Sequence, residues 1–420
     1  TTAPSTPTLA LPINDFATNY YKINFSWSSS DDTGWRGNSG VAGYNLQISS
    51  DENFSFYDTI FVVDLSTTVS LTTQSTYYWR VSAVDNVGNI SEFSSVYYLH
   101  YDTTPPNVLR NFGEQTGWYN SDPGNFVDID FEEGGTYGSS RLNELKYRVT
   151  NNPDGSGIEF VPYTLIVSSP YNQFSYTEVW SLNWDLLQEY TTNYVHLYYS
   201  DRAGNFGIWN GCFYVLKDTT PPNQVSLSSP SDGFTTNYQT ITFSWQQANY
   251  SRSGISGYEI YISTTSDFSV FISSDFTQAE ACDCQLSQGL YYWRVRAVDN
   301  AENYGLWSVD YQLIIDTTPP QTVSVLYTPI DNYATNQLTL TFSWQSVSDD
   351  FSGVKNYILQ ISTDINFSII NYSSTTNQTS LTTTLSQSTY YWRVCAEDHA
   401  GNISEFSPVW SVLIDTTPPS

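Results

Sequence analysis

The sequence of 420 residues contains no methionine, only three histidines and four cysteines, and few charged side chains. Basic residues are the scarcest of the charged ones, because 14 Lys and Arg side chains face 42 Asp and Glu side chains and leave a formal net charge of -28. Nucleic acids and anionic membrane surfaces attract basic proteins, so we expect neither as a partner. Divalent cations, in contrast, suit a surplus of carboxylates.

Apolar runs long enough to span a bilayer are also absent, so we expect no membrane span in this segment. Neither a Gly-Lys-Ser/Thr phosphate loop nor a Gly-x-Ser-x-Gly nucleophile turn occurs. His100, His196 and His399 stand at different repeat positions, without a Cys or an acid at metal-ligand spacing. We predict that the chain is not an enzyme, has no catalytic residue and requires no cofactor, with Ca²⁺ as the one candidate ion.

What the sequence does contain is a repeat. The segment Tyr77–Asn89 (YYWRVSAVDNVGN) returns with small changes at 291–303 and 390–402, and in degenerate form at 194–205. Each copy is followed by Asp-Thr-Thr-Pro-Pro, which begins at Asp102, Asp218, Asp316 and Asp415. A period near one hundred residues is typical of one domain with its own core. We predict four domains, at residues 1–102, 103–218, 219–316 and 317–420.

Short runs of alternating apolar and polar residues fill the first, third and fourth repeats and predict β-strands. In Ile23-Asn-Phe-Ser-Trp27, for example, every second side chain is apolar and shares one face of the strand. The same alternation predicts an aromatic core made of Trp27, Tyr77, Trp79, Trp245, Tyr291, Trp293, Trp344, Tyr390 and Trp392. We therefore expect an all-β fold of four tandem antiparallel sandwiches. The divergent second repeat is interpreted as the same sandwich with insertions, and residues 180–187 predict a short helical turn.

The inward Trp, the Tyr that opens a later strand and the Arg-Val-x-Ala-Val-Asp run resemble fibronectin type III-like and Ig-like repeats. The Asp-x-x-Gly-Asn and Asp-Thr-Thr-Pro-Pro signatures resemble tandem repeats of prokaryotic cell-surface and extracellular filament proteins. The resemblance implies an extracellular or cell-surface location and a tandem array, but no single activity. It also implies that Tyr77, Tyr291 and Tyr390 are corner tyrosines bonded to nearby backbone, with Tyr194 as the candidate in the second repeat.

The linkers predict a stiff connection between repeats. Proline fixes its own φ and favours extended geometry in the residue before it, so two prolines in series form a short rigid spacer. We therefore expect the four sandwiches to form an extended rod.

Acidic residues recur at the linkers and in two loops that the sandwich topology brings to the end where the preceding linker enters. We expect Asp102 to approach Glu132, Glu133 and Asp201, with equivalent groups at the later junctions. The candidate metal ligands are Asp102, Asp201, Asp218, Asp299, Asp316, Asp349, Asp350 and Asp398. Two interpretations remain open: a Ca²⁺ clamp at each junction, or acids that hydrogen-bond their own turns.

Cysteines and sequons suggest further features. Cys212, Cys282, Cys284 and Cys395 are not equivalent across repeats, so a Cys282–Cys284 ring, cross-links between chains and unpaired thiols all stay open. Candidate glycosylation sites of the Asn-x-Ser/Thr type are Asn24, Asn53, Asn89, Asn249, Asn366, Asn371, Asn377 and Asn402.

The outward-facing residues of the Tyr-Tyr-Trp-Arg-Val strands offer one more candidate surface. Tyr78, Tyr292 and Tyr391 stand beside Arg80, Arg294 and Arg393, either as a stripe that binds sugars or proteins or, as we favour, as cross-strand packing.

The first functional hypothesis is a structural one: a repeat segment of an extracellular stalk, sheath or filament that self-associates, so that its partners are copies of the chain. One alternative is an adhesin that binds glycans or surface proteins through the divergent residues 107–217. Another is a non-catalytic spacer of a large secreted hydrolase.

Overall fold

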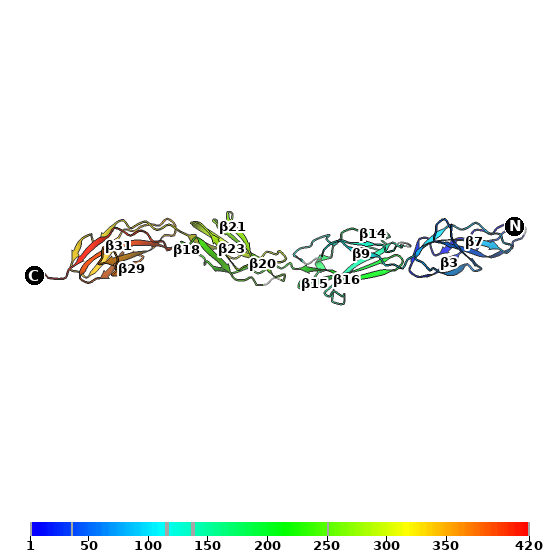
Figure 1. Cartoon of the computed structure of the whole chain (residues 1–420), viewed down its shortest axis with the longest axis horizontal. Coiled ribbons are helices and arrows are strands. Elements are labelled where there is room, and N and C mark those ends of the chain that lie inside the picture. The colour runs from blue at the N-terminus through cyan, green and yellow to red at the C-terminus, as the bar shows by residue number, and fades with distance from the viewer. Residues whose placement is uncertain (1, 35–36, 114–116, 136–138, 250–251, 419–420) are drawn as a thin grey trace. The chain divides into compact units, whose positions relative to one another are not determined.

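The computed structural model describes residues 2–34, 37–113, 117–135, 139–249 and 252–418 (Figure 1). In these residues the strands form eight sheets, of three and five strands in turn, and the prediction of an all-β chain of tandem sandwiches is confirmed. The chain divides into two units, residues 1–219 and 220–420, each holding two repeats. Among the described residues, no helix has the length and apolar character needed to cross a membrane.

The first repeat shows the layout that the others follow. Its three-stranded sheet has the order β1-β3-β6, and its five-stranded sheet the order β2-β8-β7-β4-β5. The short edge strand β2 runs parallel to β8, whereas the other neighbours are antiparallel. The strands are β1 (Leu9–Leu11), β2 (Phe16–Thr18), β3 (Lys22–Trp27), β4 (Val41–Ser49), β5 (Asp58–Val62), β6 (Ser66–Ser70), β7 (Ser75–Asp85) and β8 (Tyr97–Tyr101).

The third and fourth repeats have the same strand orders, β17-β19-β22 with β18-β24-β23-β20-β21 and β25-β27-β30 with β26-β32-β31-β28-β29. The third comprises β17 (Leu227–Ser229), β18 (Phe234–Thr236), β19 (Thr240–Trp245), β20 (Ile255–Ser263), β21 (Phe271–Thr277), β22 (Ala281–Gln285), β23 (Gly289–Asp299) and β24 (Tyr311–Ile315). The fourth comprises β25 (Leu326–Thr328), β26 (Tyr333–Thr335), β27 (Thr339–Trp344), β28 (Val354–Ser362), β29 (Tyr372–Thr376), β30 (Ser380–Thr384), β31 (Ser388–Asp398) and β32 (Trp410–Ile414).

The second repeat keeps two sheets, β14-β11-β9 and β10-β16-β15-β12-β13, but lengthens several strands. Its elements are β9 (Asn107–Arg110), β10 (Trp118–Tyr119), β11 (Ile129–Glu132), β12 (Leu142–Thr150), β13 (Glu159–Val167), β14 (Ser175–Tyr176), η1 (Trp184–Leu186), β15 (Thr192–Asp201) and β16 (Phe206–Lys217). The 3-10 helix η1 lies inside the segment for which a helical turn was predicted.

Each repeat buries its own aromatic core between the two sheets. Trp79 is fully buried and meets Phe25 edge to face at 5.1 Å between ring centroids. The third and fourth repeats repeat this pair, as Phe243 with Trp293 and Phe342 with Trp392. The other predicted core side chains are buried too, namely Trp27, Trp245, Tyr291, Trp344 and Tyr390, whereas Tyr77 is half-buried. Edge-to-face aromatic pairs of this kind contribute about 0.5–1.5 kcal/mol beyond the burial of their surface.

The corner tyrosine lies near the start of β7, β23 or β31 and bonds to the segment just upstream of its strand. The hydroxyl of Tyr77 donates to the main-chain oxygen of Thr73 at 2.7 Å, and that of Tyr291 donates to Ser287 at 3.0 Å. In the fourth repeat, the Tyr390 hydroxyl bonds the Ser386 hydroxyl at 3.0 Å.

In the second repeat this position belongs to Asn193 and not to Tyr194. The Asn193 side chain is fully buried, accepts the backbone N–H of Gln188 at 2.8 Å and donates to the Gln188 carbonyl at 2.8 Å. Tyr194 points to the opposite face of β15 and contacts Tyr214. The expectation for Tyr194 was off by one residue, because side chains alternate faces along a strand and a one-residue shift in alignment inverts every position.

On the outer face of the five-stranded sheet, one arginine in each of three repeats is held between two aromatic rings. The Arg80 guanidinium lies 4.1 Å from the ring centroid of Phe54 and 4.2 Å from that of Phe93. Equivalent clamps are Arg294 with Phe268 and Trp307, and Arg393 with Phe367 and Phe406. Phe54, Phe268 and Phe367 reach the arginine from left-handed backbone, at φ 55 to 56°.

These clamps favour packing over a sugar-binding stripe on this face. The partners of Arg80 are loop aromatics and the Gln47 side chain on the neighbouring strand, which accepts from Arg80 Nε at 2.9 Å. Tyr78 instead contacts Tyr98 on the adjacent strand.

The corner of the second repeat is testable with two neighbouring substitutions. We expect Asn193→Ala to destabilise this repeat by about 1–3 kcal/mol, because the buried Val215 carbonyl and the backbone groups of Gln188 lose their partner. Tyr194→Ala, on the outer face, should cost clearly less. Urea unfolding of the full chain followed by tryptophan fluorescence measures both, and an equal loss in the two variants would contradict the assignment.

Candidate cation sites at the domain junctions

The linker that leaves the first repeat carries a fully buried carboxylate, that of Asp102. Its Oδ1 accepts from Gln74 Nε2 at 3.0 Å and from the backbone N–H of Thr104 at 3.0 Å. Its Oδ2 accepts from the backbone N–H of Ser140 at 2.9 Å, which belongs to the second repeat. One carboxylate therefore joins a side chain of the first repeat, the linker and a loop of the second repeat.

The end of β15 brings a second acid to this place. Asp201 is buried and accepts the backbone N–H of Asn205 at 2.9 Å and its side-chain Nδ2 at 2.7 Å. The same Nδ2 donates to the main-chain oxygen of Asp102 at 2.9 Å. Asn205 thus ties the loop to the incoming linker, which accounts for the recurring Asp-x-x-Gly-Asn signature.

The third acid is Glu133, directly after β11. One oxygen of each of Asp102, Glu133 and Asp201 lies within 4.8 Å of the others. Both Glu133 carboxylate oxygens are fully enclosed and have no hydrogen-bond partner. The linker also packs tightly here, because a Cβ added to the next residue, Gly134, would collide with the main-chain oxygen of Pro105.

Crowding of acids changes their protonation. Burial, and after it the negative charges of Asp201 and Asp102, raises the pKa of Glu133 to about 8. Burial also raises the pKa of Asp201 to about 6, against the lowering effect of its hydrogen bonds from Asn205.

Nearby arginines do not neutralise this cluster. Arg202 Nη1 lies 3.1 Å from Asp15 Oδ2, and Arg141 Nη1 lies 3.6 Å from the same atom. Asp15 belongs to the first repeat, so these ion pairs fasten the junction beside the cluster. Within the part of the chain that the structure describes, no ion pair involves the three clustered acids.

The junction between the third and fourth repeats repeats the arrangement with Asp316, Asp349 and Asp398, again within 4.8 Å. Asp316 Oδ2 accepts the backbone N–H of Ser352 at 3.0 Å. The side chain of Asn402 bridges Asp398 Oδ2 at 2.7 Å and the Asp316 main-chain oxygen at 2.8 Å. Asp349 differs from Glu133 because its Oδ1 accepts two backbone N–H groups of its own loop.

The structure sorts the predicted ligands into three groups. Asp102 lies close to Asp201 and to Glu133, and Asp316 lies close to Asp349 and Asp398. The neighbours Asp350 and Glu132 are exposed and lie outside the clusters. Asp218 and Asp299 belong to different units, so the site expected there stays a prediction. Hydrogen bonds to their own turns occur as well, so turn formation and metal binding are compatible roles.

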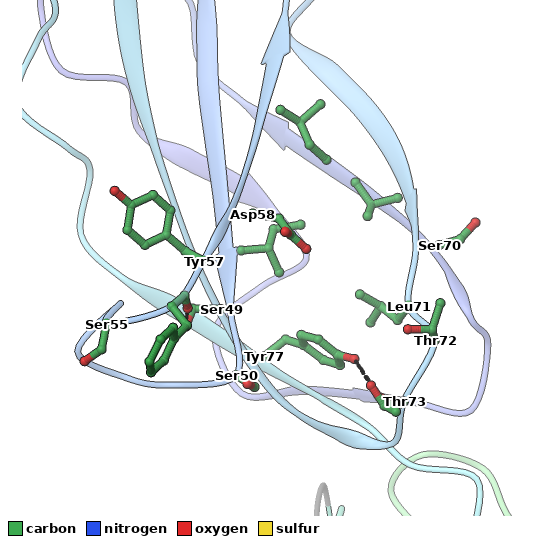
Figure 2. Close-up of a pocket in the computed structure, with 14 residues that line it drawn as sticks. Ser49, Ser50, Ser55, Tyr57, Asp58, Ser70, Leu71, Thr72, Thr73 and Tyr77 are labelled. Atoms are coloured by element: carbon green, nitrogen blue, oxygen red, sulfur yellow. Dashed lines mark hydrogen bonds between the residues drawn. The ribbon is translucent and has the colours of Figure 1, made fainter.

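A surface pocket lies elsewhere, in the first repeat, with a volume of about 620 Å³ (Figure 2). Figure 2 shows the Tyr77 hydroxyl bonded to Thr73 at its base and Asp58 and Tyr57 along its wall. Asp58 is the one titratable acid in this lining, which otherwise carries Ser, Thr, Tyr and apolar residues. An acid–base pair for hydrolysis is therefore not formed among the described residues of this pocket.

The cysteine thiols are enclosed to different degrees, and some of the sequon side chains form hydrogen bonds within the fold. All four cysteines are free, with Cys212 and Cys395 buried and Cys282 and Cys284 partly buried. Cys395 is completely enclosed. Asn89 donates its side-chain nitrogen to Asp85 at 2.6 Å, and Asn402 is bonded as described above, so a glycan at either would displace these hydrogen bonds. The sequon residues Asn24, Asn53, Asn249, Asn366, Asn371 and Asn377 are exposed.

Thiol reactivity should follow this burial. Burial raises the pKa of Cys395 to about 11 and that of Cys212 to about 12, so the reactive thiolate is scarce at neutral pH. We expect both thiols to react with Ellman's reagent only after denaturation, whereas Cys282 and Cys284 react slowly in the native chain. Single Cys→Ser variants assign the signals, and rapid native labelling of Cys395 would contradict the structure.

Stability without added metal should fall as the pH rises from about 6.5 to 8. In this window the unfolded Glu133 is ionised while the folded one still holds its proton, so the folded state binds more protons and loses stability with increasing pH. The window lies above the ordinary pKa of histidine. We expect a loss on the order of 1 kcal/mol in urea unfolding with EDTA, because solvent screens part of the effect at this partly exposed side chain. Glu133→Gln should abolish it and Glu132→Gln should keep it; the reverse result would contradict the assignment.

Comparisons with known proteins give partial likenesses. No protein-family model matches the chain. Exoglucanase B of Cellulomonas fimi is 28% identical over 227 residues, which are 51% of this chain and 19% of that protein, so the chain spans about a fifth of that relative. Fibronectin(III)-like modules of Clostridium thermocellum CbhA match at 18% identity and a TM-score of 0.32, over 46% of this chain and 94% of theirs.

A second solved structure, the FN1-FN3 domains of chicken CNTN1, matches at 16% identity and a TM-score of 0.26, over 74% of this chain and 99% of that one. The sheet topology of the chain itself defines tandem fibronectin type III-like sandwiches.

Proposed function

We propose that the chain is a non-catalytic, extracellular spacer segment of a secreted hydrolase. The observation that carries this proposal is the match to Exoglucanase B, in which about half of this chain aligns with less than a fifth of the relative. Such a partial match is expected from accessory modules that are joined to a catalytic domain within one protein.

The geometry of the acids supports a non-catalytic role. Glycoside hydrolases place two carboxylates on either side of an open sugar-binding cleft. Here the closely spaced acids Asp102 and Asp201 are buried where a linker meets a repeat, and each accepts a backbone N–H. A polysaccharide cannot reach carboxylates held in this way.

The linkers supply what a spacer needs, which is a defined connection between successive repeats. Asp102 and Asp316 each accept a backbone N–H from the loop of the following repeat. Because these two linkers are bonded to the repeat before and to the repeat after, they hold their repeats at a more defined separation than an unbonded flexible tether would.

A self-associating filament is the second candidate, and one recurring surface feature favours it. Three repeats carry a small groove beside the proline that follows β1, β17 or β25. Exposed aromatic side chains lie in these grooves: Phe16 and Tyr20, Phe234 and Tyr238, and Tyr333. Repeated apolar surface is a common basis of lateral association.

Electron microscopy of the purified chain and the full coding sequence separate the candidates. For a spacer, we expect the purified chain to hydrolyse neither soluble nor insoluble β-glucan and to appear as single particles in electron micrographs. We also expect the full coding sequence to encode a catalytic domain. Deleting residues 1–420 from that enzyme should leave kcat on a soluble substrate unchanged. Ordered filaments of the purified chain, or a full protein without a catalytic domain, would overturn the spacer and favour the structural role.

A further inference from the structure

We propose that the two acidic clusters at the domain junctions bind Ca²⁺, which bridges the linker of one repeat to two loops of the next. The first site consists of Asp102, Glu133 and Asp201. The second consists of Asp316, Asp349 and Asp398. This inference does not depend on the spacer proposal, because it concerns how repeats are joined and not what the joined repeats carry.

The spacing of the oxygens fits a calcium ion. Ca²⁺ binds oxygen at about 2.3–2.6 Å, so ligands on opposite sides of the ion lie at most about 4.6–5.2 Å apart. The ligand oxygens at each site already lie within 4.8 Å of one another. Mg²⁺ binds oxygen at about 2.0–2.1 Å in octahedral geometry, so a magnesium ion would require the acids to move closer together.

The donor set also favours a hard cation. Both clusters consist of carboxylates, and neither contains a His or Cys ligand of the kind that Zn²⁺ prefers. Three acids at each site suit a divalent ion. The two nearest arginines of the first junction, Arg141 and Arg202, are directed to Asp15 instead.

A second, independent observation points to a ligand at the first site. Both carboxylate oxygens of Glu133 are enclosed without a hydrogen-bond partner, although the other two acids accept several hydrogen bonds. An enclosed carboxylate without a partner is costly, and a bound cation would satisfy it. The hydroxyl of Ser139, next to the Ser140 that donates to Asp102, is likewise enclosed without a partner.

The second junction preserves the same features with a different acid. Ser352 donates its backbone N–H to Asp316, as Ser140 does to Asp102, and its hydroxyl is also enclosed without a partner. Asp349 replaces Glu133 with a shorter side chain that its own loop already bonds. The shared arrangement in two repeats of divergent sequence indicates that the position of three carboxylates, and not one particular loop, defines the site.

A bound ion would couple elements that the chain otherwise joins only by hydrogen bonds. At the first site the three acids come from the linker, from the loop after β11 and from the end of β15. At the second site they come from the linker, from the loop after β27 and from the end of β31. An ion that contacts all three acids binds the junction only while the linker and the two segments of the following repeat are together. It therefore stabilises this joined state, and the stabilisation grows with the occupancy of the ion.

The chain provides matched controls for the test, because Glu133 and Asp349 each have an exposed acidic neighbour, Glu132 and Asp350. Calcium binding to the full chain is measured by isothermal titration, and thermal unfolding is recorded in EDTA and in about 5 mM CaCl₂, with Glu133→Gln against Glu132→Gln and Asp349→Asn against Asp350→Asn. We expect dissociation constants of about 10⁻⁴–10⁻³ M, as in other extracellular modules. Glu133→Gln and Asp349→Asn should each weaken one site at least about tenfold, whereas the exposed controls bind normally.

The melting curves distinguish a cation from a proton held by the cluster. With Ca²⁺ sites, calcium raises the melting temperature of the wild-type chain by several degrees, and Glu133→Gln loses part of this shift although it is more stable than wild type in EDTA. A melting temperature that does not respond to Ca²⁺, or equal binding losses in Glu133→Gln and Glu132→Gln, would overturn the proposal. Neither outcome bears on whether a catalytic domain accompanies the chain, so failure here is separate from failure of the spacer.

Discussion

The enclosure of a linker carboxylate by the next repeat is the constraint on which each described junction depends. Asp102 and Asp316 are fully buried, although an ionised carboxylate leaves water only where donors or cations replace its hydration. The donors at Asp102 come from the first repeat, the linker and the second repeat. Because all three must be in place together, the linker and the loops of the following repeat are positioned as one group.

Inside each repeat, a different set of contacts stabilises the fold without forming a reactive site. The Trp79 position packs against a phenylalanine between the sheets, and the Arg80 position is clamped between aromatic rings outside them. Both arrangements recur in the third and fourth repeats. Features that repeat with the fold are explained by folding, and they therefore support a structural contribution of the chain better than a catalytic one.

The second repeat shows how such a module changes while its position between linkers is kept. Asn193 takes over the backbone contact of the corner tyrosine, and His196 stands at the position of the clamped arginine. His196 is fully buried and satisfied by the Thr150 hydroxyl and the Gly211 N–H. The junction acids remain, with Glu133 in place of an aspartate. Divergence is thus greatest in the middle of the repeat and smallest where it meets the linker of its neighbour.

The sequence alone determined the all-β architecture, the period of the repeats and most of the core, because alternation along a strand and recurrence along the chain are local properties. It also indicated which acids approach one another, since the topology brings the same loops to each junction. Only the tertiary structure decided that Asn193 and not Tyr194 fills the corner, that Cys395 is enclosed, and that Glu133 is the acid left without a partner. Whether a side chain is buried, and which groups it bonds, depends on segments that are far apart in the chain. A pattern of neighbouring residues does not contain this information.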